Sequence, residues 1–176
     1  MSGQSLSSSP QSLTREQFLS NLICELTGLL EQLAGKEDSD GLISLVGQSL
    51  ARWINDLYRK SYDVEKLDFD QVCHTLVDLK RRINGGFHIV SADREKIVLR
   101  SNTCPFGDKV IGHESLCMTT SNVFGVIASD NLGYSKVSLH ETIARRAPEC
   151  EIVVYLRDSP EANADTGREY CREHNT

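Results

Sequence analysis

The spacing of apolar residues changes in the middle of this chain, and this change constrains the fold more than any other feature. Before Gly85 and Gly86, apolar residues recur every three or four positions, as in amphipathic helices. After them come short alternating runs, typical of strands, with one further helical segment between them. The expected helices cover 13–36, 41–60, 68–84 and 113–130, and the expected strands cover 87–90, 96–100, 134–139 and 150–156.

This order predicts an α+β fold, with N-terminal helices followed by an antiparallel sheet. Along the chain, the sheet is expected to consist of two hairpins with a helix between them, and to pack on the helices. Four segments are expected: a disordered tail, an amphipathic helix for packing or dimerisation, a sensory or output domain and a polar C-terminal tail. They cover 1–12, 13–36, 41–157 and 158–176.

Two of the expected helices begin with capping signals. Thr14 is followed three residues later by Gln17, which is the pattern of a capping box, and Asp68 can cap the third helix. The first helix carries a stripe of leucines that it cannot bury alone. We therefore expect it to pack on the domain or in a homodimer.

The charge of the chain limits its partners. The net charge is −6 with no long basic run, which argues against direct binding of nucleic acid or an anionic membrane. No apolar stretch approaches the ~20 residues that span a bilayer, and the N-terminus lacks the pattern of a signal peptide. These features predict a cytoplasmic protein. In a reducing compartment, the six cysteines are expected to be buried thiols or metal ligands.

Motifs for common catalytic chemistry are absent from the sequence. There is no phosphate-binding glycine loop, no dinucleotide-binding glycine pattern and no zinc-protease motif. The serine-hydrolase elbow is missing too, and nothing arranges serine and histidine as a triad. The sequence therefore predicts a protein that is not an enzyme.

Three cysteines on three different elements form the candidate site. Cys104 lies in a Cys-Pro-Phe-Gly-Asp loop, Cys117 near the start of a helix, and Cys150 at the start of a strand. Cys117 and Cys150 share faces with apolar residues and are expected to point inward. Three soft ligands can hold zinc or an iron–sulfur cluster. The other interpretation is that these thiols are small buried hydrophobes.

Two further residues could complete a metal site. His113 lies four residues before Cys117, one helical turn away, and Glu141 lies in the segment that leads back to Cys150. Either could instead be a surface residue. Cys24 and Cys73 are expected to be packing residues.

The segment Cys104-Pro-Phe-Gly-Asp-Lys-Val-Ile-Gly-His-Glu-Ser-Leu-Cys117 resembles the methanogen output domain group. The segment from Ser138 to Cys150 resembles the last hairpin of that group, and also that of the 4-vinyl-reductase-type sensor domains. The resemblance covers about residues 41–157. It implies a sensory or output module, with Cys104, Cys117 and Cys150 as ligands of zinc or a cluster and Glu141 as a fourth. Ala144 stands where the zinc-binding sensors have another cysteine.

These observations leave three hypotheses about function. The first is a non-catalytic signal-transduction domain that binds a metal, a cluster or a small molecule and signals to a protein partner. The second is a metal-free module in which the thiols line an apolar pocket for a small molecule or respond to oxidants. The third is an enzyme that uses Cys104 or Cys117 as nucleophile with His113.

Overall fold

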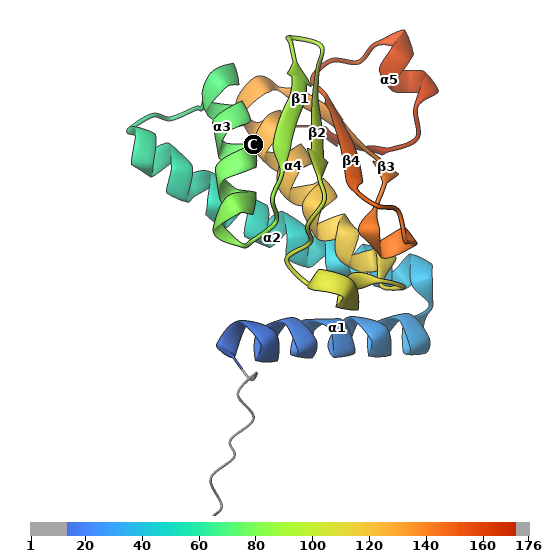
Figure 1. Cartoon of the computed structure of the whole chain (residues 1–176). Coiled ribbons are helices and arrows are strands. Elements are labelled where there is room, and N and C mark those ends of the chain that lie inside the picture. The colour runs from blue at the N-terminus through green and yellow to red at the C-terminus, as the bar shows by residue number, and fades with distance from the viewer. Residues whose placement is uncertain (1–13, 172–176) are drawn as a thin grey trace, which may run out of the picture.

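The structure is a computed structural model that describes residues 14–171, and its element order confirms the predicted α+β fold (Figure 1). Three long helices come first, and a sheet with one long helix inserted follows. The helices are α1 (Arg15–Ala34), α2 (Lys36–Tyr62), α3 (Phe69–Arg82), α4 (Cys117–Leu132) and α5 (Pro160–Ala164). The strands are β1 (His88–Ala92), β2 (Lys96–Ser101), β3 (Tyr134–Glu141), β4 (Cys150–Tyr155) and β5 (Arg168–Cys171).

Both predicted capping signals form. The Thr14 hydroxyl accepts a hydrogen bond of 3.1 Å from the backbone N–H of Gln17, and the Gln17 side chain accepts one from the N–H of Thr14. Asp68 and Gln71 make the same reciprocal pair at the start of α3. Each pair satisfies two backbone donors that a helix start would otherwise leave free.

The sheet is antiparallel throughout, with the strand order β1-β2-β4-β3-β5. Because side chains alternate along a strand, Ile97, Ile152 and Val154 share one face, where they join the main core with α3 and α4. Val153 and Tyr155 lie on the other face and pack against Ala162 of α5.

The C-terminal part of the chain differs from the expectation of a polar tail over 158–176. It contains α5 and β5, and β5 pairs with β3 at the edge of the sheet. Tyr170 of β5 is buried, and its hydroxyl lies 2.9 Å from the hydroxyl of Ser121 in α4. The predicted disordered tail over 1–12 lies outside the described residues.

The first two helices keep their large apolar residues on the outside, so the leucine stripe of α1 does not provide its contact with the domain, which was one of the two expectations for this helix. The inward side of α1 presents Cys24 and Thr27, and that of α2 presents Gly47 and Ala51. A side chain at Gly47 would come within 2.9 Å of Asn122 in α4, so α2 and α4 approach closely. The exposed large residues are Phe18, Leu19, Leu22, Ile23, Leu26, Leu29 and Leu33 of α1, with Leu42, Leu45, Val46, Leu50, Trp53 and Leu57 of α2.

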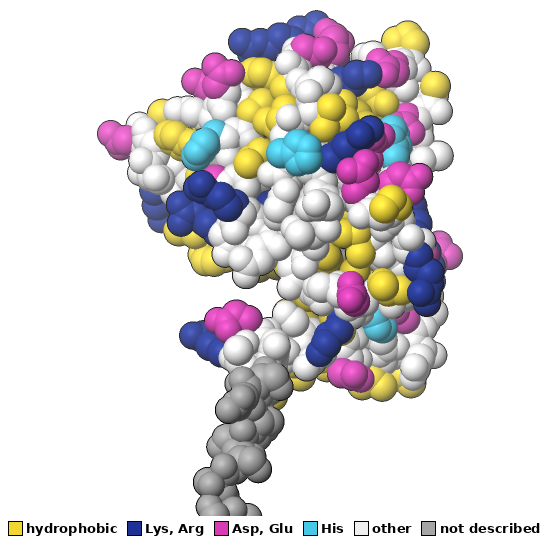
Figure 2. All heavy atoms as spheres, viewed as in Figure 1, with side chains coloured by type: hydrophobic (Ala, Val, Ile, Leu, Met, Phe, Trp, Pro, Cys, Tyr) yellow, Lys and Arg dark blue, Asp and Glu magenta, His cyan; other side chains and the backbone are white. Residues whose placement is uncertain are grey.

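The charged surface is mixed. On the face shown in Figure 2, basic and acidic side chains lie interspersed, without a large patch of one sign. Between residues 14 and 171, no helix combines the length and hydropathy needed to cross a bilayer.

A candidate ligand cavity lined by three cysteines

The loop that carries Cys104 is fixed by short-range hydrogen bonds. The Ser101 hydroxyl donates to the carbonyl of Gly85 at 3.0 Å and accepts from the N–H of Thr103 at 3.1 Å. The carbonyl of Cys104 accepts from the N–H of Gly107 at 2.9 Å, and Gly107 has a φ of +57°, which glycine adopts readily. These contacts hold the Cys104 thiol against the ends of α3 and β2.

The other two thiols stand at the first residues of regular elements. Cys117 begins α4, directly after a short 3-10 turn over Glu114–Leu116. Cys150 begins β4, and its sulfur accepts a hydrogen bond of 3.4 Å from the N–H of Ile143. A helix start and a strand start are more firmly fixed than a loop, so both sulfurs have defined positions.

All three thiols line one small cavity, of about 100 Å³, between the sheet and the helices. We call it the cysteine cavity. Its wall is mostly apolar and also contains the side chain of Lys80 from α3 and four threonines. The apolar part of the wall includes Phe87, Phe106, Val110, Leu116, Leu139 and Ile152.

Burial dominates the electrostatics of these thiols. It raises the pKa of Cys117 to about 12 and raises the pKa of Cys104 and of Cys150 above the usual value. The nearby Lys80 ammonium acts in the opposite direction on each of them without overcoming burial. The three thiols are therefore protonated at neutral pH, which is unfavourable for a cysteine nucleophile.

The two residues predicted to complete the site lie elsewhere. His113 does not line the cavity; its Nδ1 atom lies 3.0 Å from Oε2 of Glu31 in α1. Glu141 is exposed at the end of β3 and is also absent from the wall. Without His113 at the thiols, the geometry gives no support to the hypothesis of a cysteine enzyme.

The arrangement does not fit the predicted zinc or iron–sulfur site. Among residues 14–171, no group of three or more His, Cys, Asp or Glu side chains is arranged to hold a metal ion. The thiols lack a fourth ligand, and the Lys80 ammonium in the same wall repels a metal cation. Metal binding through Cys104, Cys117 and Cys150 stays a prediction from the sequence without support from the geometry.

Helix α1 covers the side of the site formed by the two 3-10 turns, as Figure 1 shows at the lower end of the molecule. Cys24 of α1 packs with Val110, Leu116 and Ala144 in a second, smaller core, and Cys104 and Cys117 border it. The packing role predicted for Cys24 and Cys73 agrees with their burial. Helix α1 packs on this smaller core through Cys24, which lies off the leucine stripe.

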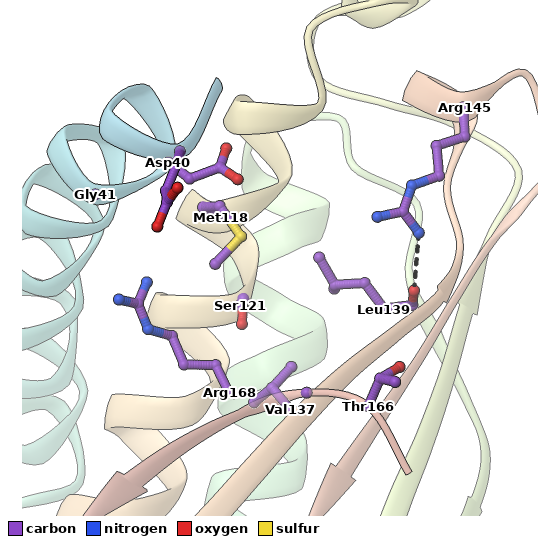
Figure 3. A pocket seen from close by; sticks show the side chains of 11 residues that line it. Asp40, Gly41, Met118, Ser121, Val137, Leu139, Arg145, Thr166 and Arg168 are labelled. Carbon is purple, nitrogen blue, oxygen red and sulfur yellow. Dashed lines mark hydrogen bonds between the residues drawn. The ribbon is translucent and has the colours of Figure 1, made fainter. Parts of the chain in front are cut away.

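A second, larger cavity of about 500 Å³ lies on the other side of Leu139. Figure 3 shows its wall, with Asp40 and Arg168 on one side and Arg145 on the other. The Arg145 guanidinium donates a hydrogen bond of 3.3 Å to the carbonyl of Leu139. This cavity is more open than the cysteine cavity and contains no cysteine, so the predicted site residues do not belong to it.

Lys80 is the site residue that the sequence analysis missed. Its position before Arg81 and Arg82, in the last turn of α3, is typical of a solvated helix end. One signal was available: Lys80 follows Cys73 and Leu76 by seven and four residues, which places it on the buried face of the helix.

A solved structure shares the fold. It is a trafficking protein particle complex subunit 3 from Naegleria fowleri, covalently bound to palmitic acid. The TM-score is 0.55 at 12% identity, covering 89% of this chain and 99% of that one. At this identity the likeness shows the fold alone. None of the curated proteins matches the chain.

The family model of methanogen output domain 1 matches residues 22–155, which include all three cysteines of the cavity and most of α1. The match covers well over half of the 176 residues. The chain therefore belongs to the methanogen output domain 1 family.

Proposed function

We propose that this protein is a regulatory output module that binds a small, mainly apolar molecule in the cysteine cavity and signals to a protein partner through α1 and α2. One observation carries the proposal: three cysteines from a loop, a helix start and a strand start converge on a single apolar cavity. Apolar cavities with a few polar groups are the usual form of small-molecule sites.

The size of the cavity limits the ligand. At about 100 Å³ it is smaller than the ~150 Å³ cavity that holds benzene in another protein. A short branched aliphatic chain is therefore the largest occupant we expect. The structural neighbour is covalently bound to palmitic acid, and a chain of that length exceeds this cavity.

Helix α1 provides a route from the cavity to the surface. Glu31 of α1 accepts hydrogen bonds around the 3-10 turn that leads into Cys117: His113 approaches its carboxylate at 3.0 Å, and the N–H of Ser115 at 3.4 Å. Glu114 in the same turn pairs with Lys36 of α2 and with Arg145. A ligand that moves this turn therefore acts directly on α1.

The outer face of α1 and α2 supplies the output surface. At their exposed fractions, the thirteen large apolar residues present roughly 1,000 Å² of apolar surface, against ~800 Å² per partner in a standard interface. A second copy of this chain can cover the face with the same helix pair, and we propose this homodimer as the signalling form.

A titration with isobutanol, a short branched alcohol, followed by amide NMR tests the ligand site. We expect the largest shifts at the amides of Cys104, Cys117 and Cys150. Cys150→Leu fills the cavity and should remove these shifts, whereas Cys171→Leu changes an exposed cysteine outside it and should not. Shifts confined to the second cavity, around Asp40 and Arg168, would contradict the proposal.

A further inference from the structure

Lys80 is a buried cation without a carboxylate partner within residues 14–171. Only 5% of the residue is exposed. Its ammonium donates a hydrogen bond of 2.6 Å to the hydroxyl of Thr120 in α4 and lies 5.5 and 5.4 Å from the ring centres of Phe87 and Phe124. Burying a lysine ammonium without an ionic partner destabilises the folded state, so the environment of Lys80 needs an explanation.

The surroundings satisfy the ammonium only in part. An ammonium has three donors, and Thr120 takes one of them. The two rings stabilise the positive charge but accept no conventional hydrogen bond. The remaining donors belong to a side chain that forms part of the cavity wall.

The titratable groups that face Lys80 are the thiols of Cys104, Cys117 and Cys150, from the loop, α4 and β4. Burial lowers the pKa of Lys80 to about 8, and the three thiols oppose that change. Since the thiols are themselves protonated at neutral pH, they do not neutralise the ammonium. The cavity therefore keeps a net positive charge near its apolar wall.

We propose that the natural ligand of the cysteine cavity is a small carboxylate, whose apolar part contacts the thiols and whose carboxylate pairs with Lys80. This inference rests on the proposed function and specifies its ligand class. A carboxylate supplies the acceptors that the ammonium lacks, in a charge-assisted hydrogen bond. A phosphate needs several donors at once, and the wall offers one cation among apolar groups and threonines.

The test compares isobutyrate with isobutanol, which has the same branched carbon skeleton without the charge. At about pH 7 we expect the wild-type protein to bind isobutyrate at least about tenfold more tightly, as for a hydrogen bond between charged groups. The preference should fall as the pH rises through the pKa of Lys80, because the ammonium loses its proton. This comparison needs no variant.

Two variants sharpen the test. Lys80→Met should abolish the preference for isobutyrate and leave isobutanol bound, whereas Lys66→Met, at an exposed lysine, should change neither affinity. If wild-type protein binds isobutanol as tightly as isobutyrate, the carboxylate inference is wrong and the cavity proposal stands. If neither probe shifts the cavity amides, both fail.

Discussion

The imidazole of His113 lies 3.0 Å from the carboxylate of Glu31, and this contact joins the segment before Cys117 to helix α1. Both side chains are partly buried. A side chain at Gly28 would come within 3.0 Å of the same imidazole, so the helix also lies close to it. One side of α1 thus contacts the turn before Cys117, which borders the cavity, while the leucines of α1 are exposed.

A charge in the outer face should break the proposed homodimer. Leu26 is 53% exposed in the middle of the α1 stripe. In a dimer, Leu26→Glu would bury an unpaired charge, so we expect the free energy of dimer association to weaken by at least about 2 kcal/mol. Sedimentation over a dilution series measures this. The adjacent, exposed Glu25→Gln is the control, and wild-type protein that stays monomeric at high concentration would rule out the dimer.

Gly125→Ala should destabilise the docking of β5. An added Cβ at this position would collide with the ring of Tyr170, which is 7% exposed in the core. Overpacking of this kind costs about 1–3 kcal/mol. Gly41→Ala is the matched control, since nothing lies within 4 Å of its Cβ position and alanine favours a helix by about 0.5–1 kcal/mol. Equal unfolding free energies for the two variants in urea would contradict the packing of β5.

Because of Asp78, the free energy of unfolding should fall as the solution becomes acidic. The Tyr58 hydroxyl donates to it at 2.7 Å, and Arg82 and Arg81 also pair with it, which holds the pKa of this buried carboxylate far below its usual value. A lowered folded-state pKa stabilises the fold above the unfolded value of ~3.9, and this contribution is lost as the pH falls further.

Urea unfolding between about pH 6 and pH 3 measures the first part of this loss, which we expect to be about 1 kcal/mol, since the unfolded carboxyl takes up its proton only near pH ~3.9. Asp78→Asn should lower the stability at neutral pH and flatten the acid dependence. The exposed Asp56→Asn should keep the wild-type profile. An unchanged slope in Asp78→Asn would show that this cluster does not carry the effect.

The cysteines should differ strongly in reactivity. Because the thiolate is the reactive form, the pKa of about 12 at Cys117 predicts alkylation at least about a hundredfold slower than at the exposed Cys171. Iodoacetamide labelling at about pH 8, read by peptide mass spectrometry, gives both rates in one sample. Fast labelling of Cys117 would instead favour the thiolate that a metal site or a cysteine enzyme requires.

Much of the fold was predictable because local signals agree with it. The caps at Thr14 and Asp68 form as expected, and the alternation around Ile152 places Cys150 on the core face. The shared helix face likewise brings Cys117 inward. These elements follow from periodicity and capping, which act over a few residues.

The remaining features depend on contacts between distant segments. Strand β5 has four residues, and only Tyr170 among them is buried, so its sequence lacks a strand pattern. The leucines of α1 face outward although apolar side chains usually face the core, because Cys24 and Thr27 face the domain instead. The pairing of His113 with Glu31 joins residues 82 positions apart, and no short-range signal indicates it.

Hydrogen exchange of α1 tests the central claim most directly, namely that the cysteine cavity controls this helix. With isobutanol at saturation, we predict that amide exchange over Arg15–Ala34 changes at least about threefold, since partial openings of surface helices respond to small free-energy changes. In Glu31→Ala, which cuts the contact with His113, the ligand should still shift the cavity amides but leave the exchange of α1 unchanged. The same exchange in wild-type α1 with and without bound isobutanol would contradict the account.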